Sequence, residues 1–306
     1  MSKLRKIRDT VIYKDERYYC GPGPSPVNLG NGEILVAFRR CSSLTAGHHF
    51  NPSTQACTVK SYDNGLSWTQ KPKFFACGGV VNQNLVLLPD GSIVDVTVRY
   101  EILHSPPYDM SFVKGIDKRF VYQGAYGSHF SLGAEAYRSN DKGETWGGPH
   151  RTALVPGFEP LLPGASSPTG IRCKGLVLDD GTLVWSLYTL DGPFLMASRD
   201  GGTTWKFRAY IVRTDEKHLN EASVYQCPSG KLVAFIRCEA GDGLRYLHTA
   251  ISEDRGFTWS EPKRENVWGF PYDAIKMPSG NVLLTYGYRR EPYGIRARLL
   301  SSECDN

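Results

Sequence analysis

Residues 61–68 read SYDNGLSW, and the pattern returns at 139–146 as SNDKGETW, at 198–205 as SRDGGTTW and at 252–259 as SEDRGFTW. The four stretches share the pattern S-x-D-x-G-x-[ST]-W. An Asp side chain can close a turn by accepting bonds from backbone N–H groups just downstream, and Gly tolerates positive φ there. The Ser or Thr hydroxyl adds a second local bond, and the Trp supplies a ring to bury. We therefore interpret the pattern as turn chemistry that folds a repeated structural unit.

A second repeat alternates with the first. Short turn signals, each containing Gly, separate apolar or β-branched runs at 30–32, 89–91, 179–181, 228–230 and 278–280. Tight turns between such runs are typical of β-hairpins. Each unit therefore reads as strand, tight turn, strand, loop, strand, Asp-containing turn and strand. Four-stranded units that repeat along a chain predict an all-β fold, and more specifically a β-propeller.

The Asp-containing stretches resemble the Asp box, or BNR repeat, of the sialidase (neuraminidase) superfamily. That resemblance implies a β-propeller of four-stranded antiparallel blades, of which sialidase-like chains commonly have six. Five blades are countable here, at about 21–75, 77–155, 157–212, 215–266 and 267 to the end.

We expect residues 1–306 to form a single propeller domain. Residues 301–306 resemble the start of a fifth Asp box that stops before its Gly and Trp. The domain therefore either closes with five blades or lacks a C-terminal blade. In the first case, residues 3–18 are expected to complete the last blade.

Composition narrows the classes of function. The net charge is only +5 and no compact Lys/Arg run is present, so we expect no nucleic-acid partner. No apolar stretch is long enough to span a bilayer, and the N-terminus has no apolar leader, so we expect no membrane association and a cytoplasmic location. The eight Cys form no C-x-x-C pair, which predicts reduced thiols and neither a metal nor a cofactor.

The propeller topology predicts where a site would lie. The start of the first strand of each unit, the end of the second strand and the following loop share the face opposite the Asp boxes. Arg ends the second strand in four of the five units. Several guanidinium groups around one axis repel each other unless an anion neutralises them. A carboxylate fits this role because a planar guanidinium can bind it through two parallel hydrogen bonds. Alternatively, each of these Arg residues forms a salt bridge at the rim of the propeller. The candidate substrate-binding residues are Arg39, Arg99, Arg237, Arg289, Arg296 and Tyr288.

The resemblance also implies residue roles. Sialidases use an Arg triad for the substrate carboxylate, an Asp acid/base, and a Tyr nucleophile assisted by Glu. The stretch NEASV at 220–224 resembles the segment that carries this Glu, which would be Glu221. Arg237 resembles the second Arg of the triad, and Arg289 or Arg296 the third. The loop expected to carry the acid/base Asp holds His48 and His49 instead, and the nucleophilic Tyr of the family belongs to a blade beyond these five.

We therefore expect a sialidase-like glycoside hydrolase that acts on an anionic glycan containing sialic or uronic acid. The candidate catalytic residues are Glu221, as base or activator of a Tyr, and His48 or His49 as proton donor, because imidazole titrates near neutrality. Two alternatives stay open: a polysaccharide lyase that uses His and Tyr on the same propeller, and a non-catalytic propeller that only binds glycans. All three predict a carbohydrate partner that carries a carboxylate.

Overall fold

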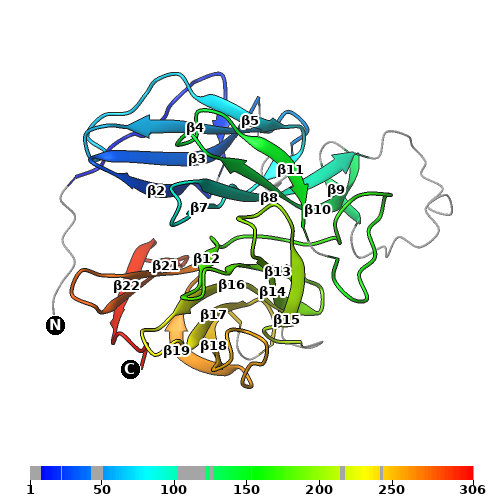
Figure 1. Cartoon of the computed structure of the whole chain (residues 1–306), viewed down its shortest axis with the longest axis vertical. Helices are drawn as coiled ribbons and strands as arrows, with labels where there is room; N and C mark the ends of the chain where they lie inside the picture. The colour runs from blue at the N-terminus through cyan, green and yellow to red at the C-terminus, as the bar shows by residue number, and fades with distance from the viewer. Residues whose placement is uncertain are drawn as a thin grey trace.

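The computed structural model describes residues 8–21, 23–42, 51–102, 121–124, 127–152, 154–213, 218–241 and 244–305. Within these ranges every regular element is a β-strand, as the turn and hairpin repeats predict. No helix in them is long and apolar enough to cross a membrane. The strands form five antiparallel sheets, which are the five blades of a β-propeller (Figure 1).

The first two blades lie in the upper half of Figure 1. In blade 1, β2, β3, β4 and β5 pair in that order, and β1 pairs with the far end of β3. In blade 2, β6 and β7 both pair with β8, β8 pairs with β10, and β10 also pairs with β9 and β11. The bounds are β1 Tyr19–Cys20, β2 Ser25–Gly30, β3 Glu33–Cys41, β4 Gln55–Ser61, β5 Lys73–Cys77, β6 Val80–Val81, β7 Leu85–Leu87, β8 Ile93–Ile102, β9 Val121–Gly124, β10 Gly127–Ser139 and β11 Gly147–Arg151.

The other three blades lie in the lower half of Figure 1. Blades 3 and 4 are four-stranded meanders, β12 to β15 and β16 to β19, whereas blade 5 has the three strands β20 to β22. The bounds are β12 Leu176–Val177, β13 Leu183–Thr189, β14 Gly192–Ser198, β15 Lys206–Tyr210, β16 Leu219–Gln226, β17 Leu232–Cys238, β18 Tyr246–Ser252, β19 Lys263–Trp268, β20 Tyr272–Lys276, β21 Val282–Tyr288 and β22 Gly294–Leu300.

The expectation that residues 3–18 complete the last blade is wrong for their described part, 8–18. Ile12 and Tyr13 pack against a cluster on blade 1, and the Tyr13 ring lies 5.0 Å from the ring of Phe38. The chain then enters β1, which belongs to blade 1 as well. Burial of these side chains therefore holds the segment on blade 1.

The Asp boxes fold as their sequence predicts, and the second box shows the shared geometry. Asp141 accepts bonds from the backbone N of Thr145 (2.8 Å) and from its hydroxyl (2.5 Å). The Ser139 hydroxyl donates to Asp141 (2.8 Å) and accepts a bond from the backbone N of Gly143 (2.7 Å). The bonds from Thr145 lower the pKa of Asp141 to about 2. The same bonds recur in the other three boxes.

Each box after the first also packs on the preceding blade. A Cβ on Gly143 would meet Leu35 of blade 1 at 2.7 Å, and one on Gly256 would meet Leu195 of blade 3 at 2.6 Å. Trp146 stacks on Phe75 of blade 1 with ring centroids 4.6 Å apart. The box is therefore a local turn and an interblade contact at once, because its Gly leaves room for the neighbouring apolar side chain.

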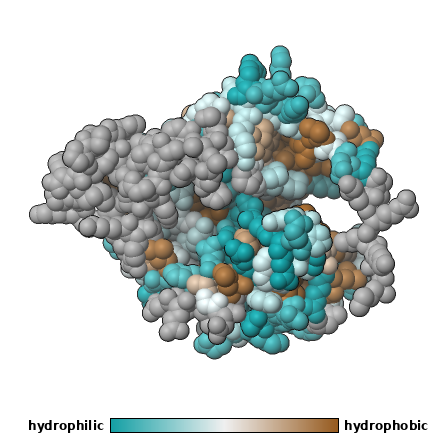
Figure 2. All heavy atoms as spheres, turned by 180° about the vertical axis from the view of Figure 1, so that it is seen from behind, coloured by the Kyte–Doolittle hydropathy of each residue, from teal (hydrophilic) through white to brown (hydrophobic). Residues whose placement is uncertain are grey.

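Apolar clusters join consecutive blades. One joins blades 1 and 2, a larger one joins blades 2 and 3, and others join blades 3 and 4 and blades 4 and 5. Within the described ranges no such cluster joins blade 5 to blade 1. On the face shown in Figure 2, apolar residues appear as separate brown patches among hydrophilic ones.

Candidate functional site

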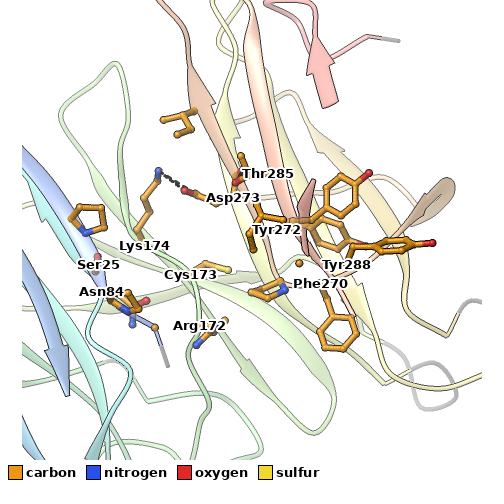
Figure 3. A pocket seen from close by; sticks show the side chains of 18 of the residues that line it. Ser25, Asn84, Arg172, Cys173, Lys174, Phe270, Tyr272, Asp273, Thr285 and Tyr288 are labelled. Carbon is orange, nitrogen blue, oxygen red and sulfur yellow. Dashed lines mark hydrogen bonds and ion pairs between the residues drawn. The ribbon is translucent and has the colours of Figure 1, made fainter. Parts of the chain in front are cut away.

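A cavity of about 730 Å³ lies where the starts of several blades meet. Its wall is formed by the entry to β2, the link between β6 and β7, the segment before β12, the entry to β20, and the end of β21 with the entry to β22. Figure 3 shows Ser25 and Asn84 on one side and Phe270, Tyr272 and Tyr288 on the other. This agrees with the prediction that first-strand starts and second-strand ends share one face.

The segment before β12 carries a cationic group into the cavity. The Trp185 indole N–H donates to the Cys173 carbonyl (2.8 Å), and the Asn82 amide donates to the Ile171 carbonyl (2.9 Å). These bonds hold the backbone on both sides of Arg172, which lines the cavity. A Cβ on Gly23, where φ is +91°, would meet the Arg172 guanidinium at 2.8 Å, so Gly23 leaves the room that this side chain needs. Arg172 makes no ion pair with any described residue.

Glu221 lies beside this cavity on a distorted part of β16. Its φ is +41°, and the β16–β17 register shifts between Asn220 and Ser223. Positive φ is unfavourable for a residue with a Cβ, and such backbone positions often occur at functional sites. The Glu221 carbonyl accepts a bond from the Cys173 thiol (3.5 Å), which ties this distortion to the segment that carries Arg172.

Arg237 links Glu221 to the aromatic wall. Its guanidinium bonds the Glu221 carboxylate at 2.8 Å and also pairs with Glu239. The guanidinium carbon lies 4.2 Å from the centroid of the Phe270 ring. With 12% of its side chain exposed, the Glu221 carboxylate is largely screened from water, and Arg237 supplies the opposite charge that such burial requires.

Arg289 lies on the same aromatic ring. Its guanidinium carbon is 4.4 Å from the Phe270 centroid. Burial, followed by the nearby charges of Arg237 and Arg172, lowers the pKa of Arg289. Arg289 forms no ion pair in the part of the chain that the structure describes. Three guanidinium groups therefore gather beside Glu221, and two of them have no acidic partner among the described residues.

Two buried polar side chains add unused hydrogen-bonding capacity to the cavity wall. Gln83 is 1% exposed and Tyr272 is 2% exposed, and both line the cavity. Neither the Gln83 amide nor the Tyr272 hydroxyl has a hydrogen-bond partner among the described residues. Burial raises the pKa of Tyr272 above its usual value, so this phenol stays protonated at neutral pH. Buried polar groups normally have partners, so these two are available to a ligand.

An ion pair crosses one side of the cavity. Lys174, from the segment before β12, lies 3.0 Å from Asp273 of β20, as the dashed line in Figure 3 marks. Both side chains are substantially exposed, so the pair contributes little to stability. It joins blade 5 to the entry of blade 3 next to Arg172.

The structure brings some of the predicted site residues together and separates others. Glu221, Arg237 and Arg289 lie close together, and Tyr288 lines the cavity. Arg296 lies 3.3 Å from the Tyr288 ring centroid rather than beside Phe270. His48 and His49 lie outside the described residues.

Arg39 and Arg99 occupy different surroundings. Arg39 is 4% exposed, packs against Gly21, and has its pKa lowered chiefly by burial. Arg99 bonds the Glu135 carboxylate (2.8 Å) and the Tyr137 hydroxyl (3.1 Å), and also donates to two backbone carbonyls of 77–78. Arg99 is therefore the salt-bridge partner that the alternative interpretation describes, and it does not line the cavity.

Sequence reasoning missed Arg172. Residues just before the first strand of each blade face the site. This rule would have predicted Arg172 if the first strand of blade 3 had been placed at β12. That strand has only two residues, Leu176–Val177, so the hydrophobic pattern there is too short to mark its start.

Comparisons with known proteins agree with this architecture. The sequence model of the BNR repeat-like domain family matches residues 120–303. A protein of unknown function from Dyadobacter fermentans is 32% identical with a TM-score of 0.86, over 98% of this chain and 84% of that one. The NanB sialidase from Streptococcus pneumoniae is 14% identical with a TM-score of 0.68, over 97% of this chain and 62% of that one.

A third solved structure, the intramolecular trans-sialidase from Ruminococcus gnavus, is 14% identical with a TM-score of 0.60, over 88% of this chain and 77% of that one. The chain thus spans less than two thirds of the NanB chain. No curated protein matches it by sequence. The chain belongs to the BNR repeat-like domain family, and its fold is the β-propeller that sialidases share.

Proposed function

We propose that this protein is a sialidase-like glycoside hydrolase that acts on a glycan ending in a carboxylate-bearing sugar, a sialic or uronic acid. One observation carries the proposal: Arg172 and Arg289 line the cavity beside Glu221 without an acidic partner among the described residues. Guanidinium groups held this close together repel each other, and a ligand carboxylate removes that repulsion while accepting bidentate bonds.

The other features of the cavity suit a sugar. Its volume of about 730 Å³ is within the range of small-molecule sites. The Gln83 amide and the Tyr272 hydroxyl offer hydrogen bonds for ring hydroxyl groups, while Phe270 and Tyr288 offer aromatic surface. The neighbours named as a sialidase and a trans-sialidase support a carbohydrate ligand, and the latter was solved with oseltamivir carboxylate.

The proposed chemistry divides the roles among a few residues. Arg172 and Arg289 hold the substrate carboxylate, and Arg237 orients Glu221 through its 2.8 Å bond. Glu221 then accepts a proton from a tyrosine or a water as the glycosidic bond breaks. His48 or His49 remains the predicted donor to the leaving group.

Turnover of fluorogenic glycosides tests this function directly. We expect the full-length chain to release 4-methylumbelliferone from sialic-acid or uronic-acid glycosides and not from neutral glycosides. Absence of cleavage across the acidic panel would refute the hydrolase proposal.

Glu221→Gln separates catalysis from binding. The amide keeps the size of the side chain but removes its charge, so we expect kcat to fall at least about 100-fold while the Kd for the free sugar acid, measured by titration calorimetry, changes about threefold or less. The control is Glu239→Gln, which alters the other carboxylate paired with Arg237. Ligand binding without any wild-type turnover would identify a glycan-binding propeller instead.

A further inference from the structure

A second group of arginines lies next to the cavity, at the junction of blades 4 and 5. The guanidinium carbon of Arg290 is 4.4 Å from the Trp268 ring centroid, and that of Arg296 is 3.3 Å from the Tyr288 centroid. Arg245 lies 5.9 Å from the Trp268 centroid. Trp268 and Tyr288 themselves meet edge to face at 5.3 Å. We call these three arginines and two rings the Arg–aromatic shelf.

No acidic side chain of the described residues neutralises the charges of the shelf. Arg245, Arg290 and Arg296 are exposed, and none of them forms an ion pair with a described residue. The Arg290 Nε donates a hydrogen bond to the Tyr288 hydroxyl at 2.5 Å. An aromatic ring holds the face of a guanidinium, which leaves the N–H groups at its edge free to bind an oxyanion.

The shelf is continuous with the cavity. Tyr288 belongs to the shelf and also lines the cavity. Arg245 lies 6.0 Å from the Phe270 centroid, and its charge contributes to the lowered pKa of Arg289. Backbone bonds from Arg245 N to the Cys238 carbonyl and from Gly269 N to the Arg245 carbonyl, both 2.9 Å, fix this position beside β19.

We propose that the shelf is a second anion subsite, so that the preferred ligand is a glycan with two acidic groups: a terminal carboxylate sugar in the cavity and a further carboxylate or sulfate ester on the shelf. This inference rests on the proposed function, since the first acid must bind at Arg172 and Arg289. A glycan with one acidic group neutralises only the arginines of the cavity, whereas a glycan with two acidic groups also neutralises those of the shelf.

Titration calorimetry with matched ligands tests the subsite. The probes are sialyllactose against disialyllactose and sulfated sialyllactose, and a non-sulfated chondroitin disaccharide against its sulfated form. We expect the diacidic member of the recognised sugar series to bind about tenfold more tightly than the monoacidic member, with an advantage that shrinks as salt rises. Comparison of disialyllactose with sulfated sialyllactose shows whether the shelf takes a carboxylate or a sulfate.

The variant Arg290→Ala should remove much of that advantage and leave the Kd of the monoacidic ligand within about twofold. Arg298→Ala is the matched control, because it also removes one exposed charge from blade 5 but lines a different cavity, between blades 4 and 5. If the wild type binds a monoacidic sugar but prefers no diacidic one, or if Arg290→Ala binds both equally less, the subsite is refuted and the proposed function stands. If no acidic sugar binds the wild type, both proposals fail.

Discussion

The two faces of the propeller differ in their charges: ion pairs join blades on the Asp-box face, whereas arginines without an acidic partner among the described residues gather at the cavity on the opposite face, beside the pair of Arg237 with Glu221. On the Asp-box face, Lys142 of the second box pairs with Glu33 of blade 1 at 3.0 Å, and Arg255 of the fourth box pairs with Asp179 of blade 3 at 3.3 Å. On the opposite face, Arg172 and Arg289 have no acidic partner among the described residues, although they come from the same kind of repeat.

The difference shows which charges serve the fold and which are available to a ligand. The two pairs on the Asp-box face, Lys142 with Glu33 and Arg255 with Asp179, each join the box of one blade to the hairpin-turn region of the preceding blade. The unpaired charges line a cavity and repel one another, an arrangement that costs stability in the absence of an anion. Changes on the first face should therefore act on stability, and changes on the second on ligand binding.

The largest expected effect is on the Asp-box face. Trp205 is 8% exposed, donates to the Gly202 carbonyl at 2.9 Å and lies in the core that joins blades 2 and 3. We expect Trp205→Ala to lower the free energy of unfolding by about 3–5 kcal/mol, because it removes a large buried ring. Urea unfolding followed by circular dichroism measures the loss. Trp268→Ala, on the opposite face and only partly buried, should cost clearly less; equal losses would contradict the division between the faces.

Arg172→Ala should have the largest effect on binding. We expect the Kd for the recognised sugar acid to rise about 10- to 100-fold, because a charged hydrogen-bond donor is lost. Stability should stay the same or rise slightly, because no ion pair with a described residue breaks and one repelling charge is removed. Calorimetry and a thermal melt measure the two quantities. The matched control, Arg255→Ala, breaks an ion pair on the Asp-box face and should leave the Kd unchanged. A rise in Kd of the same size in the control would remove the distinction.

A smaller effect on stability is expected at Asp95, which is buried next to the cavity wall. It is fully buried in β8, accepts a bond from the Asn84 backbone N (2.7 Å), and has its pKa raised well above the usual value by burial. The folded state therefore holds its proton more tightly than the unfolded state, so this group's contribution to stability falls as pH rises above about 4. We expect Asp95→Asn to raise stability by about 1 kcal/mol at pH 7 and by less at pH 4. Urea midpoints that show no such pH dependence would contradict this.

The smallest expected effect is the acid response of the boxes. The hydroxyl and backbone bonds lower the pKa of Asp63, Asp141 and Asp254 to about 2. Their stabilisation is therefore fully present above about pH 4 and is lost as pH falls toward 2. Asp141→Asn should flatten the fall of Tm between pH 5 and 2. Glu253→Gln, an exposed acid of the fourth box, should leave that fall unchanged; if it flattens the fall equally, general surface charge is the cause.

The shared face of Glu221, Arg237 and Arg289 was predictable because the hairpin register places strand ends together. Asn220 pairs directly with Arg237, so the ion pair from Glu221 follows from that register and the adjacent bulge. The sequence pattern does not separate Arg99 from Arg237, since both lie near the end of a second strand. Arg99 instead meets Glu135 on the neighbouring β10, a contact that depends on the pairing of that strand.

The sequence by itself determined the blades, because each Asp box and hairpin turn closes through bonds between residues at most a few positions apart. Tertiary structure decided which cations lack a partner. Arg172 and Arg289 are 117 positions apart (289 − 172), and only the ring of blades sets both into one cavity wall while it directs Arg99 toward Glu135. Electrostatic interaction depends on distance and burial in space, and neither quantity is contained in a local repeat.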